Sequence, residues 1–155
     1  SSCSSRCTSV WSVTGSVGKV RAARTIFTLG NIAHPSAYPL WVTTENADTA
    51  PVATNDHIGV RSSAGTWYFS TADGTTEQTT DISAFIAASV PIVLHVTFDG
   101  TTAKLYINGT LRATHATNVP RSTGYSSSVI IRHFVGSTGT SVDYYHFVTE
   151  IMGVV

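Results

Sequence analysis

Charged residues are scarce in this sequence. They make up 12% of the 155 residues, and lysine occurs only twice, as Lys19 and Lys104, whereas soluble domains usually carry about 25% charged residues. The scarcity excludes a disordered chain and a long coiled coil, because both depend on abundant charge. Nine basic and nine acidic residues cancel, so the chain lacks the positive charge that attracts nucleic acid. We expect no nucleic acid among its partners.

Long hydrophobic runs are missing as well. No stretch approaches the roughly 18 apolar residues of a membrane-spanning helix, so we expect no membrane insertion. Apolar residues nevertheless make up 42% of the chain and aromatic residues 10%, which is enough for the packed core of one domain of this length. We predict a single domain over residues 1–155, with a short cysteine-containing tail at residues 1–9.

Cysteine occurs twice, as Cys3 and Cys7. Three readings are open: two incidental thiols in a tail, a disulfide within the tail, or a disulfide to another chain. Zinc is disfavoured, because a tetrahedral site needs two further ligands and no histidine pair stands at ligand spacing. Any disulfide implies an oxidising compartment, or a virion or cell surface.

Short apolar stretches separated by glycine-containing turns predict the fold class. Such spacing is typical of an all-β sandwich or barrel. The strand candidates lie at residues 10–13, 17–20, 25–29, 39–43, 57–61, 66–70, 92–98, 103–107, 111–114, 128–134 and 145–151. One stretch, residues 81–89, predicts a short helix with Asp81 as its N-cap and Ile82, Phe85 and Ile86 on one face.

The most informative segment runs from His95 to Gly109. Alternating apolar residues on either side of Asp99-Gly100, followed by Asn108-Gly109, predict two successive hairpins, because both residues of Asn-Gly accept positive φ. The pattern His-Val followed by Asp-Gly and then Leu-Tyr-Ile-Asn-Gly resembles the laminin G-like, concanavalin A-like jelly-roll family. Residues 11–17, 25–31 and 147–151 are similar to other strands of that family.

This resemblance implies a two-sheet antiparallel jelly-roll sandwich. Ligands of such domains usually lie on the concave sheet or in the loops at one rim, and calcium is a common cofactor. The family usually has a tryptophan two residues before the histidine, where this chain has Val93. That departure removes a core aromatic and affects no catalytic role.

The acidic residues do not fit a glycosidase. Glycan hydrolysis uses two carboxylates that flank the scissile bond, and on a strand these appear two residues apart so that both face the groove. The three glutamates, Glu45, Glu77 and Glu150, have no carboxylate two residues away. A Gly-x-Ser-x-Gly nucleophile motif is absent as well. We therefore predict no catalytic residues and no enzymatic activity.

Three kinds of binding residue are candidates. Oxygen ligands for calcium stand in loop-like segments, and the same residues also fit ordinary solvated loops. Aromatic rings suit stacking on sugar rings, although one member of each adjacent pair must face the core. The calcium candidates are Asp48, Asn55, Asp56 and Asp73, and the aromatic candidates are Trp41, Trp67, Tyr68, Tyr144 and Tyr145. Asn108 begins an Asn-Gly-Thr glycosylation sequon, but the hairpin needs Asn-Gly for its own geometry.

Charge of opposite sign is concentrated in two segments. Residues 1–24 carry four basic and no acidic residues, while residues 45–81 carry six acidic residues and one arginine. These are either solvated loops or complementary surfaces, and complementary surfaces suit head-to-tail self-association.

Two functions are therefore open. One is a non-catalytic recognition module that binds carbohydrate or a protein surface, and the other is a structural subunit of a virion, tail or extracellular filament. A lectin-fold glycosidase is a third reading, which the acidic residues oppose. The expected location is extracellular, at a cell surface or on a virion.

Overall fold

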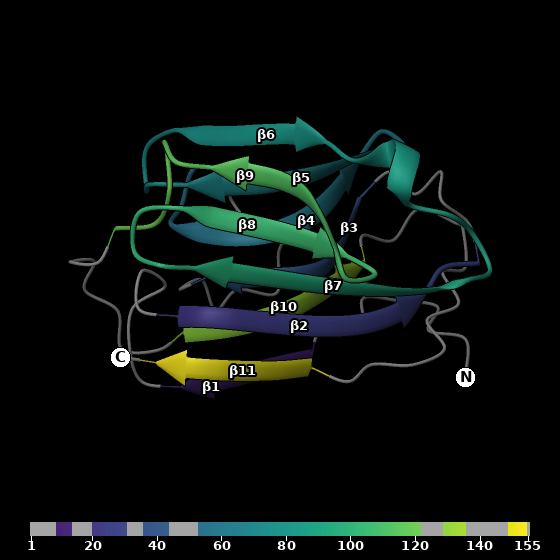
Figure 1. Ribbon diagram of the computed structural model, residues 1–155, viewed down its shortest axis with the longest axis horizontal. Helices are drawn as coiled ribbons and strands as arrows, with labels where there is room; N and C mark the ends of the chain where they lie inside the picture. The colour runs from purple at the N-terminus through teal and green to yellow at the C-terminus, as the bar shows by residue number, and fades with distance from the viewer. Residues whose placement is uncertain are drawn as a thin grey trace.

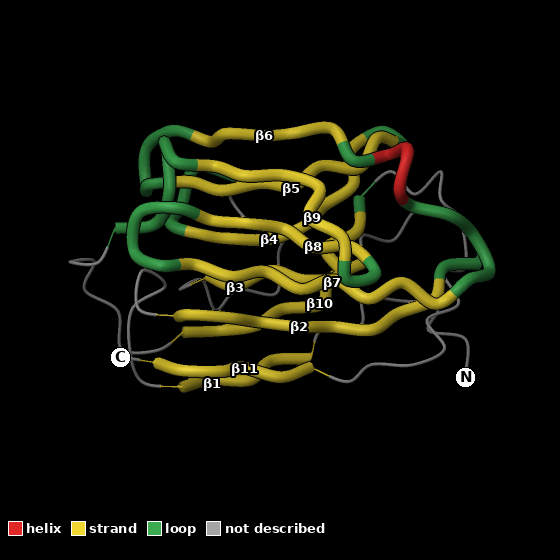
Figure 2. Tube along the Cα trace, viewed as in Figure 1, coloured by secondary structure: helices red, strands yellow, loops and turns green. Residues whose placement is uncertain are grey.

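Two antiparallel β-sheets lie face to face in a computed structural model of the chain, and the core lies between them (Figure 1). The structure describes residues 9–13, 20–30, 36–43, 53–121, 129–135 and 149–154. Figure 2 shows that strands account for nearly all of the regular structure, with a single short helical segment. The predicted all-β, two-sheet jelly roll is confirmed.

The six-stranded sheet has the order β1-β10-β3-β4-β5-β6, and the five-stranded sheet has the order β11-β2-β7-β8-β9. The strands of the first are β1 (Ser9–Val13), β10 (Val129–Val135), β3 (Ala37–Thr43), β4 (His57–Ser63), β5 (Thr66–Ala72) and β6 (Glu77–Asp81). Those of the second are β11 (Thr149–Val154), β2 (Val20–Thr28), β7 (Pro91–Phe98), β8 (Ala103–Ile107) and β9 (Thr110–His115). Strands from distant parts of the sequence therefore lie side by side in both sheets.

The core follows from the alternation of side chains along each strand. On β7 and β8 every second residue is buried between the sheets, and Phe98, Leu105 and Ile107 are at most 3% exposed. Phe27, from β2, and Phe69, from β5, belong to the same apolar cluster. The predicted inward orientation of Phe98, Leu105 and Ile107 is confirmed.

Two strand predictions need correction. Residues 17–20 and 25–29 were expected as separate strands, but β2 continues without a break from Val20 to Thr28, because Val20 and residues 22–28 pair with β7 or β11. Strand β6 was not expected at all. Its sequence, Glu-Gln-Thr-Thr-Asp, has no apolar residue, and it is held in the sheet by backbone pairing with β5.

The predicted helix over residues 81–89 is a single 3-10 turn, η2 (Ser83–Phe85). The chain stays extended up to Ile82, whose N–H bonds to the Trp67 carbonyl, and it is extended again at Ile86. Ile82 and Ile86 are buried, but Phe85 is 38% exposed. The Arg112 guanidinium carbon lies over the Phe85 ring, 4.1 Å from the ring centroid. The prediction that Phe85 shares a buried face with Ile82 and Ile86 is wrong. A single turn of three residues is too short to place all three side chains on one helical face.

Asn108 and Gly109 form the predicted two-residue turn. Their φ angles are +51° and +80°, and Ile107 pairs with Thr110 across the turn. The Asn108 side-chain oxygen also accepts a hydrogen bond from the Val93 N–H at 2.8 Å. Asn108 therefore has a structural role in the hairpin. Its glycosylation stays a prediction.

The same tetrapeptide, Asp-Gly-Thr-Thr, forms two hairpin loops, at residues 73–76 in the six-stranded sheet and 99–102 in the five-stranded sheet. In each loop the aspartate Oδ1 accepts three hydrogen bonds from the following threonines. These bonds lower the pKa of Asp99 and lower that of Asp73 to about 2. Both loops lie at the same end of the molecule (Figure 1).

Glycine is required more strongly at residue 74 than at residue 109. Alanine at either position adopts positive φ, which costs about 1–2 kcal/mol. A Cβ at residue 74 would also clash with Arg121 Nη2, whereas a Cβ at residue 109 meets nothing within 4 Å. We expect Gly74→Ala to destabilise the fold more than Gly109→Ala in urea unfolding, because Arg121 must leave Asp56. Equal costs would contradict this arrangement.

Candidate functional site

The outer face of the six-stranded sheet carries a group of polar and aromatic side chains that lie outside the main core cluster. We define this outer face by the side chains on β3 to β6 that point away from the five-stranded sheet. Their neighbours along each strand, such as Val42, Val60 and Phe69, belong to the core. The outer-face residues include Tyr38, Trp41, Thr43, His57, Arg61, Tyr68, Ser70, Glu77, Thr79 and Asp81.

A β-bulge places two aromatic rings together at one side of this face. The pairing between β10 and β3 shifts by one residue, so that Tyr38 and Trp41 both lie on the outer side while Leu40 enters the core. Their ring centroids are 5.0 Å apart in an edge-on arrangement. Trp41 is fully buried, and its Nε1–H has no hydrogen-bond acceptor in the described part of the chain.

Gly59 makes room for the Trp41 ring. Gly59 is directly opposite Trp41 in the sheet, and a Cβ there would lie 2.5 Å from the Leu40 carbonyl oxygen and 2.6 Å from Trp41 Cε3. The indole therefore lies close against the β4 backbone and stacks on the His57 ring, with centroids 3.9 Å apart and planes at 19°. Both rings of this stack are fully buried.

A chain of polar contacts runs from His57, in this stack, to Glu77 on the edge strand β6. His57 Nδ1 is 2.8 Å from the Asn55 carbonyl oxygen, and His57 Nε2 is 2.7 Å from Ser70 Oγ. Ser70 Oγ is 2.5 Å from Glu77 Oε1. Burial lowers the pKa of His57, to about 4, while the Asn55 carbonyl and the Glu77 carboxylate raise it.

The chain ends at a fixed ion pair. Arg61 donates through Nε to Glu77 Oε1 at 2.8 Å and through Nη2 to Glu77 Oε2 at 2.9 Å. The Arg61 guanidinium also lies over the Tyr68 ring, 5.3 Å from its centroid. The Arg61 and Glu77 side chains are 15% and 18% exposed, and Tyr68 is partly exposed. Two charged groups and an aromatic ring are thus held at the surface in one orientation.

Two of the predicted sugar-stacking rings are unsuitable. Trp67 is 1% exposed and packs in the core between the sheets, and Trp41 is covered in the stack with His57. Tyr68 is the outward member of its pair, as alternation requires. Tyr144 and Tyr145 lie outside the described residues, as do Cys3 and Cys7. Among the described residues, Tyr68 is the one aromatic candidate on the outer face that is partly exposed.

The acidic residues proposed for calcium gather around an arginine. Asp56 Oδ2 accepts from Arg121 Nη2 at 3.0 Å and Asp56 Oδ1 accepts from the Arg121 backbone N–H. The carboxylates of Asp56 and Asp73 together raise the pKa of Arg121. Among the described residues no group of three or more metal-binding side chains occurs. Asn55 contacts His57 through its backbone, and Asp48 lies outside the described residues. Calcium binding stays a prediction.

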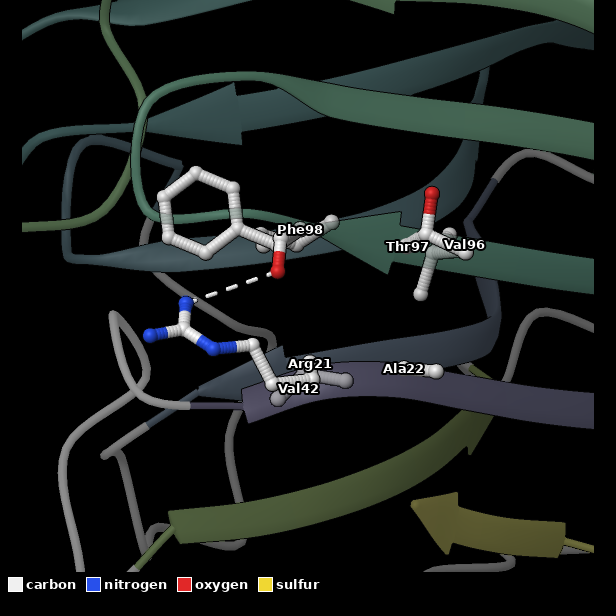
Figure 3. A pocket seen from close by; sticks show the side chains of 7 residues that line it. Arg21, Ala22, Val42, Val96, Thr97 and Phe98 are labelled. Carbon is white, nitrogen blue, oxygen red and sulfur yellow. Dashed lines mark hydrogen bonds between the residues drawn. The ribbon is translucent and has the colours of Figure 1, made fainter. Parts of the chain in front are cut away.

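A small hollow between the sheets is not a ligand site. It is lined by residues of β2, β3, β4 and β7, and the side chain of Arg21 extends along it to donate to the Phe98 carbonyl oxygen at 3.5 Å (Figure 3). The hollow leaves no room for a water molecule. Its role is confined to the packing of one end of the sandwich.

The outer face lacks a glycosidase pair among its described residues. Glu77 and Asp81 are its two carboxylates, four residues apart on β6, which corresponds to about 13 Å along a strand. Glycosidase carboxylates are about 5–5.5 Å apart in retaining enzymes and 6.5–9.5 Å in inverting enzymes. Glu77 is bound by Arg61 and Ser70, and Asp81 Oδ1 accepts from the Ser83 N–H.

Sequence reasoning missed the group formed by His57, Arg61, Ser70 and Glu77. His57, Gly59 and Arg61 alternate along one predicted strand, which indicated a shared face. The position of Glu77 on a strand could not be predicted from the sequence, because β6 carries no apolar pattern that indicates a strand. Only the pairing of β6 with β5 brings Glu77 to Ser70 and Arg61.

The architecture is that of a lectin-like jelly roll with a polar and aromatic outer face. A family model for laminin G domains, of the concanavalin A-like lectin/glucanases superfamily, matches residues 18–147. The chain belongs to this superfamily. A search among curated protein sequences gave no match. No helix in the described part of the chain is long and apolar enough to cross a membrane.

Solved structures with the same fold include both hydrolases and lectins. A β-glucanase of Bacillus licheniformis matches with a TM-score of 0.57 and 16% identity, over 93% of this chain and 68% of the glucanase. Sheep galectin-11, in complex with glycerol, matches with a TM-score of 0.55 and 13% identity, over 92% of this chain and 96% of the galectin. A variant of human galectin-16 matches with a TM-score of 0.55 and 15% identity, over 92% and 95%. These similarities establish the fold, and the fold by itself does not decide between catalysis and binding.

Proposed function

We propose that this chain is a non-catalytic carbohydrate-binding domain, whose site is the outer face around Arg61, Tyr68 and Glu77. The observation that carries the proposal is the bidentate Arg61–Glu77 pair beside the partly exposed Tyr68 ring. Sugars present hydroxyl groups and an apolar ring face. A ligand site therefore needs a few oriented polar groups beside an aromatic surface.

The polar groups are fixed before a ligand arrives. Glu77 is held from two sides by Arg61 and Ser70, and Arg61 is held by Glu77 and Tyr68. Groups that are already ordered lose little conformational entropy on binding. The Trp41–His57 stack and Gly59 lie beside them on the same face of the sheet. Membership in a superfamily that contains lectins supports carbohydrate as the ligand.

Substitution of Tyr68 tests the site. We expect Tyr68→Ala and Arg61→Ala to weaken binding of a glycan selected on an array by about tenfold or more, as loss of a central contact does. Tyr106→Ala is the matched control, because Tyr106 is a partly exposed tyrosine on the five-stranded sheet. Calorimetry measures affinity, and circular dichroism checks that each variant is folded.

Three outcomes contradict the proposal: no glycan binds, Tyr106→Ala weakens binding as much as Tyr68→Ala, or the chain hydrolyses the glycan. Hydrolysis that disappears in Glu77→Gln would identify an enzyme.

Repeating the binding measurement with a chelator tests the predicted calcium dependence. Self-association also stays a prediction for size-exclusion chromatography. In the described structure Asp56 and Glu77 of the acidic segment are already paired with arginines of the same chain. The expected extracellular, cell-surface or virion location matches where glycans are displayed.

A further inference from the structure

Two edge strands lie together along one side of the sandwich. In the described part of the chain, β6 ends the six-stranded sheet and β9 ends the five-stranded sheet, so each has a neighbouring strand on one side only. His115 on β9 contacts the Thr80 hydroxyl at 2.9 Å, and Thr117, just beyond β9, donates to Gln78 at 2.9 Å. The two strands run in opposite directions (Figure 1). We call this side, formed by residues 77–81 and 110–115, the open edge.

On β6 the unpaired backbone groups belong to Thr79 and Asp81. The Ile82 N–H bonds to the Trp67 carbonyl oxygen at 2.8 Å. Because successive residues of an antiparallel strand direct their backbone groups to opposite sides, the N–H and C=O groups of Thr79 and Asp81 point away from β5. Both residues are exposed. Unpaired groups along an edge are a template for one further strand.

On β9 the corresponding groups belong to Thr114. The Asn108 N–H bonds to the Val93 carbonyl oxygen at 2.9 Å, so the same alternation along β8 directs the backbone of Leu105 toward β9. The partner of Leu105 on β9 is Ala113. The N–H and C=O groups of the next residue, Thr114, therefore point away from β8, and Thr114 is exposed as well.

Charge decides which edges can pair with each other. Strand β6 carries Glu77 and Asp81 and no basic residue, whereas β9 carries Arg112 and no acidic residue. Two copies of β6 side by side, or two copies of β9, would place like charges on neighbouring strands, which is destabilising. Strand β6 beside β9 of another copy places opposite charges there. The edge charges thus oppose indiscriminate pairing and favour this one combination.

Exposed apolar side chains lie beside the same edge. Phe85, in the η2 turn that follows β6, is 38% exposed, and Leu111 on β9 is 47% exposed. The Arg112 guanidinium carbon lies over the Phe85 ring, so these residues of η2 and β9 meet at one end of the open edge. Exposed apolar groups gathered at one place mark a surface that interacts with another molecule.

We propose that a second copy of this chain docks along the open edge, with β6 of each copy paired antiparallel to β9 of the other. A two-fold axis parallel to the strands exchanges the two sheets and keeps the strand directions, so β6 meets a strand that runs opposite to it. Because Thr80 is level with His115, Asp81 then lies opposite Thr114 of the second copy, where both backbones are unpaired. The contact is isologous, so assembly ends at a dimer.

The dimer leaves the candidate glycan site open. Pairing extends each sheet edge to edge, so the outer face with Arg61 and Tyr68 is not covered by the second copy. Two short strand pairs form a small interface, so we expect a weak and reversible dimer. It differs from head-to-tail association of the basic and acidic segments, which would continue into larger species.

Sedimentation of the unaltered protein in reducing buffer measures the association, and the reductant excludes disulfides through Cys3 or Cys7. We expect a dimer that forms between micromolar and millimolar concentration, with no larger species. Arg112→Glu places like charges at the contact, because Arg112 of the second copy is a diagonal neighbour of Asp81, and we expect it to weaken dimerisation by about tenfold or more. Asp81→Arg combined with Arg112→Glu should restore the dimer, since the opposite charges are exchanged.

Leu111→Lys and Val90→Lys are a matched pair of variants. Val90 is 45% exposed, similar to Leu111, but it precedes β7, and β8 separates β7 from β9. We expect Leu111→Lys to weaken dimerisation and Val90→Lys to leave it unchanged. Thr79→Pro removes an N–H group that points away from β5, so we expect a monomer. Circular dichroism checks that each variant is folded, and the lysine pair decides if Thr79→Pro does not fold.

Three results would overturn the paired edges. They are an unaltered protein that stays monomeric at millimolar concentration, a polymer in place of the dimer, and a dimer that is weakened equally by Leu111→Lys and Val90→Lys or by neither. Glycan binding is measured separately on the same variants. A dimer that binds no glycan refutes the proposed function but not the paired edges, and a monomer that binds glycan does the reverse.

Discussion

Replacing Leu105 with alanine is expected to lower the free energy of unfolding by about 2–5 kcal/mol, the range found when a buried leucine is truncated. Leu105 is fully buried on β8 and packs between the sheets with Leu94, Val96 and Phe98 in the main apolar cluster. The strands around it are fixed by their own ladders, so they cannot close over the cavity.

Leu111→Ala is the matched control. Leu111 lies on the neighbouring strand β9, on the outer side of the same sheet, and is 47% exposed. Its truncation should cost less than about 1 kcal/mol, since it leaves no cavity. Urea unfolding followed by circular dichroism measures both variants. Costs of similar size at the two positions would mean that the register of β8 and β9 is wrong.

Acid should destabilise the fold through His115. This residue reaches from β9 into the space between the sheets. There its ring nitrogens contact the hydroxyls of Thr71 and Thr80, 2.9 Å away in each case, and its ring packs on Phe69. His115 is 1% exposed, and burial lowers its pKa to about 4. An unfolded histidine has a pKa near 6.5.

The sign follows from proton uptake. Between about pH 6.5 and pH 4 the unfolded state binds one proton that folded His115 does not, so stability falls as the pH falls. The loss is about 1.4 kcal/mol per pH unit, and about 3 kcal/mol in total. Since net stabilities are about 5–15 kcal/mol, this is a substantial share.

His115→Gln removes the titration and keeps groups that hydrogen-bond to the two threonines. We expect the free energy of unfolding of the unaltered protein to fall more steeply between pH 6 and pH 4.5 than that of His115→Gln, by about 1.4 kcal/mol per pH unit. Contributions from His57 and from the aspartates in the turns are common to both proteins and cancel in the difference. Parallel pH profiles would show that His115 does not enter the fold as a neutral ring.

The apolar strands could be predicted from the sequence because their signal is local. Val96, Phe98, Leu105 and Ile107 alternate with polar residues, and this period of two needs no knowledge of distant residues. The Asn108-Gly109 turn was predictable for the same reason, since positive φ at both positions is a property of those residues. The inward Trp67 and the outward Tyr68 also follow from alternation, although which of the two would face outward was left open.

The repeated turn is visible in the sequence, where Asp73-Gly74 closes the strand candidate at residues 66–70. Asp-Gly-Thr-Thr at residues 73–76 predicts the same loop as its copy at residues 99–102, because the aspartate bonds to the threonines that follow it. Recognising the repeat would have shown a hairpin after β5, and with it strand β6. The helix predicted over residues 81–89 failed because a few residues of helical pattern cannot compete with pairing to Trp67 and burial of Ile82 and Ile86.

The class of fold, the core strands and the hairpin turns follow from the sequence alone, since each depends on residues that are neighbours along the chain. The candidate site exists only in the folded molecule. Glu77 belongs to an edge strand without an apolar residue, and it meets Arg61 and Ser70 only because β6 adds to β5. Asp56 and Asp73 both lie near Arg121, which is about fifty residues or more away in sequence. Contacts of this kind depend on strand order, and strand order is fixed by burial of the whole core rather than by any local pattern.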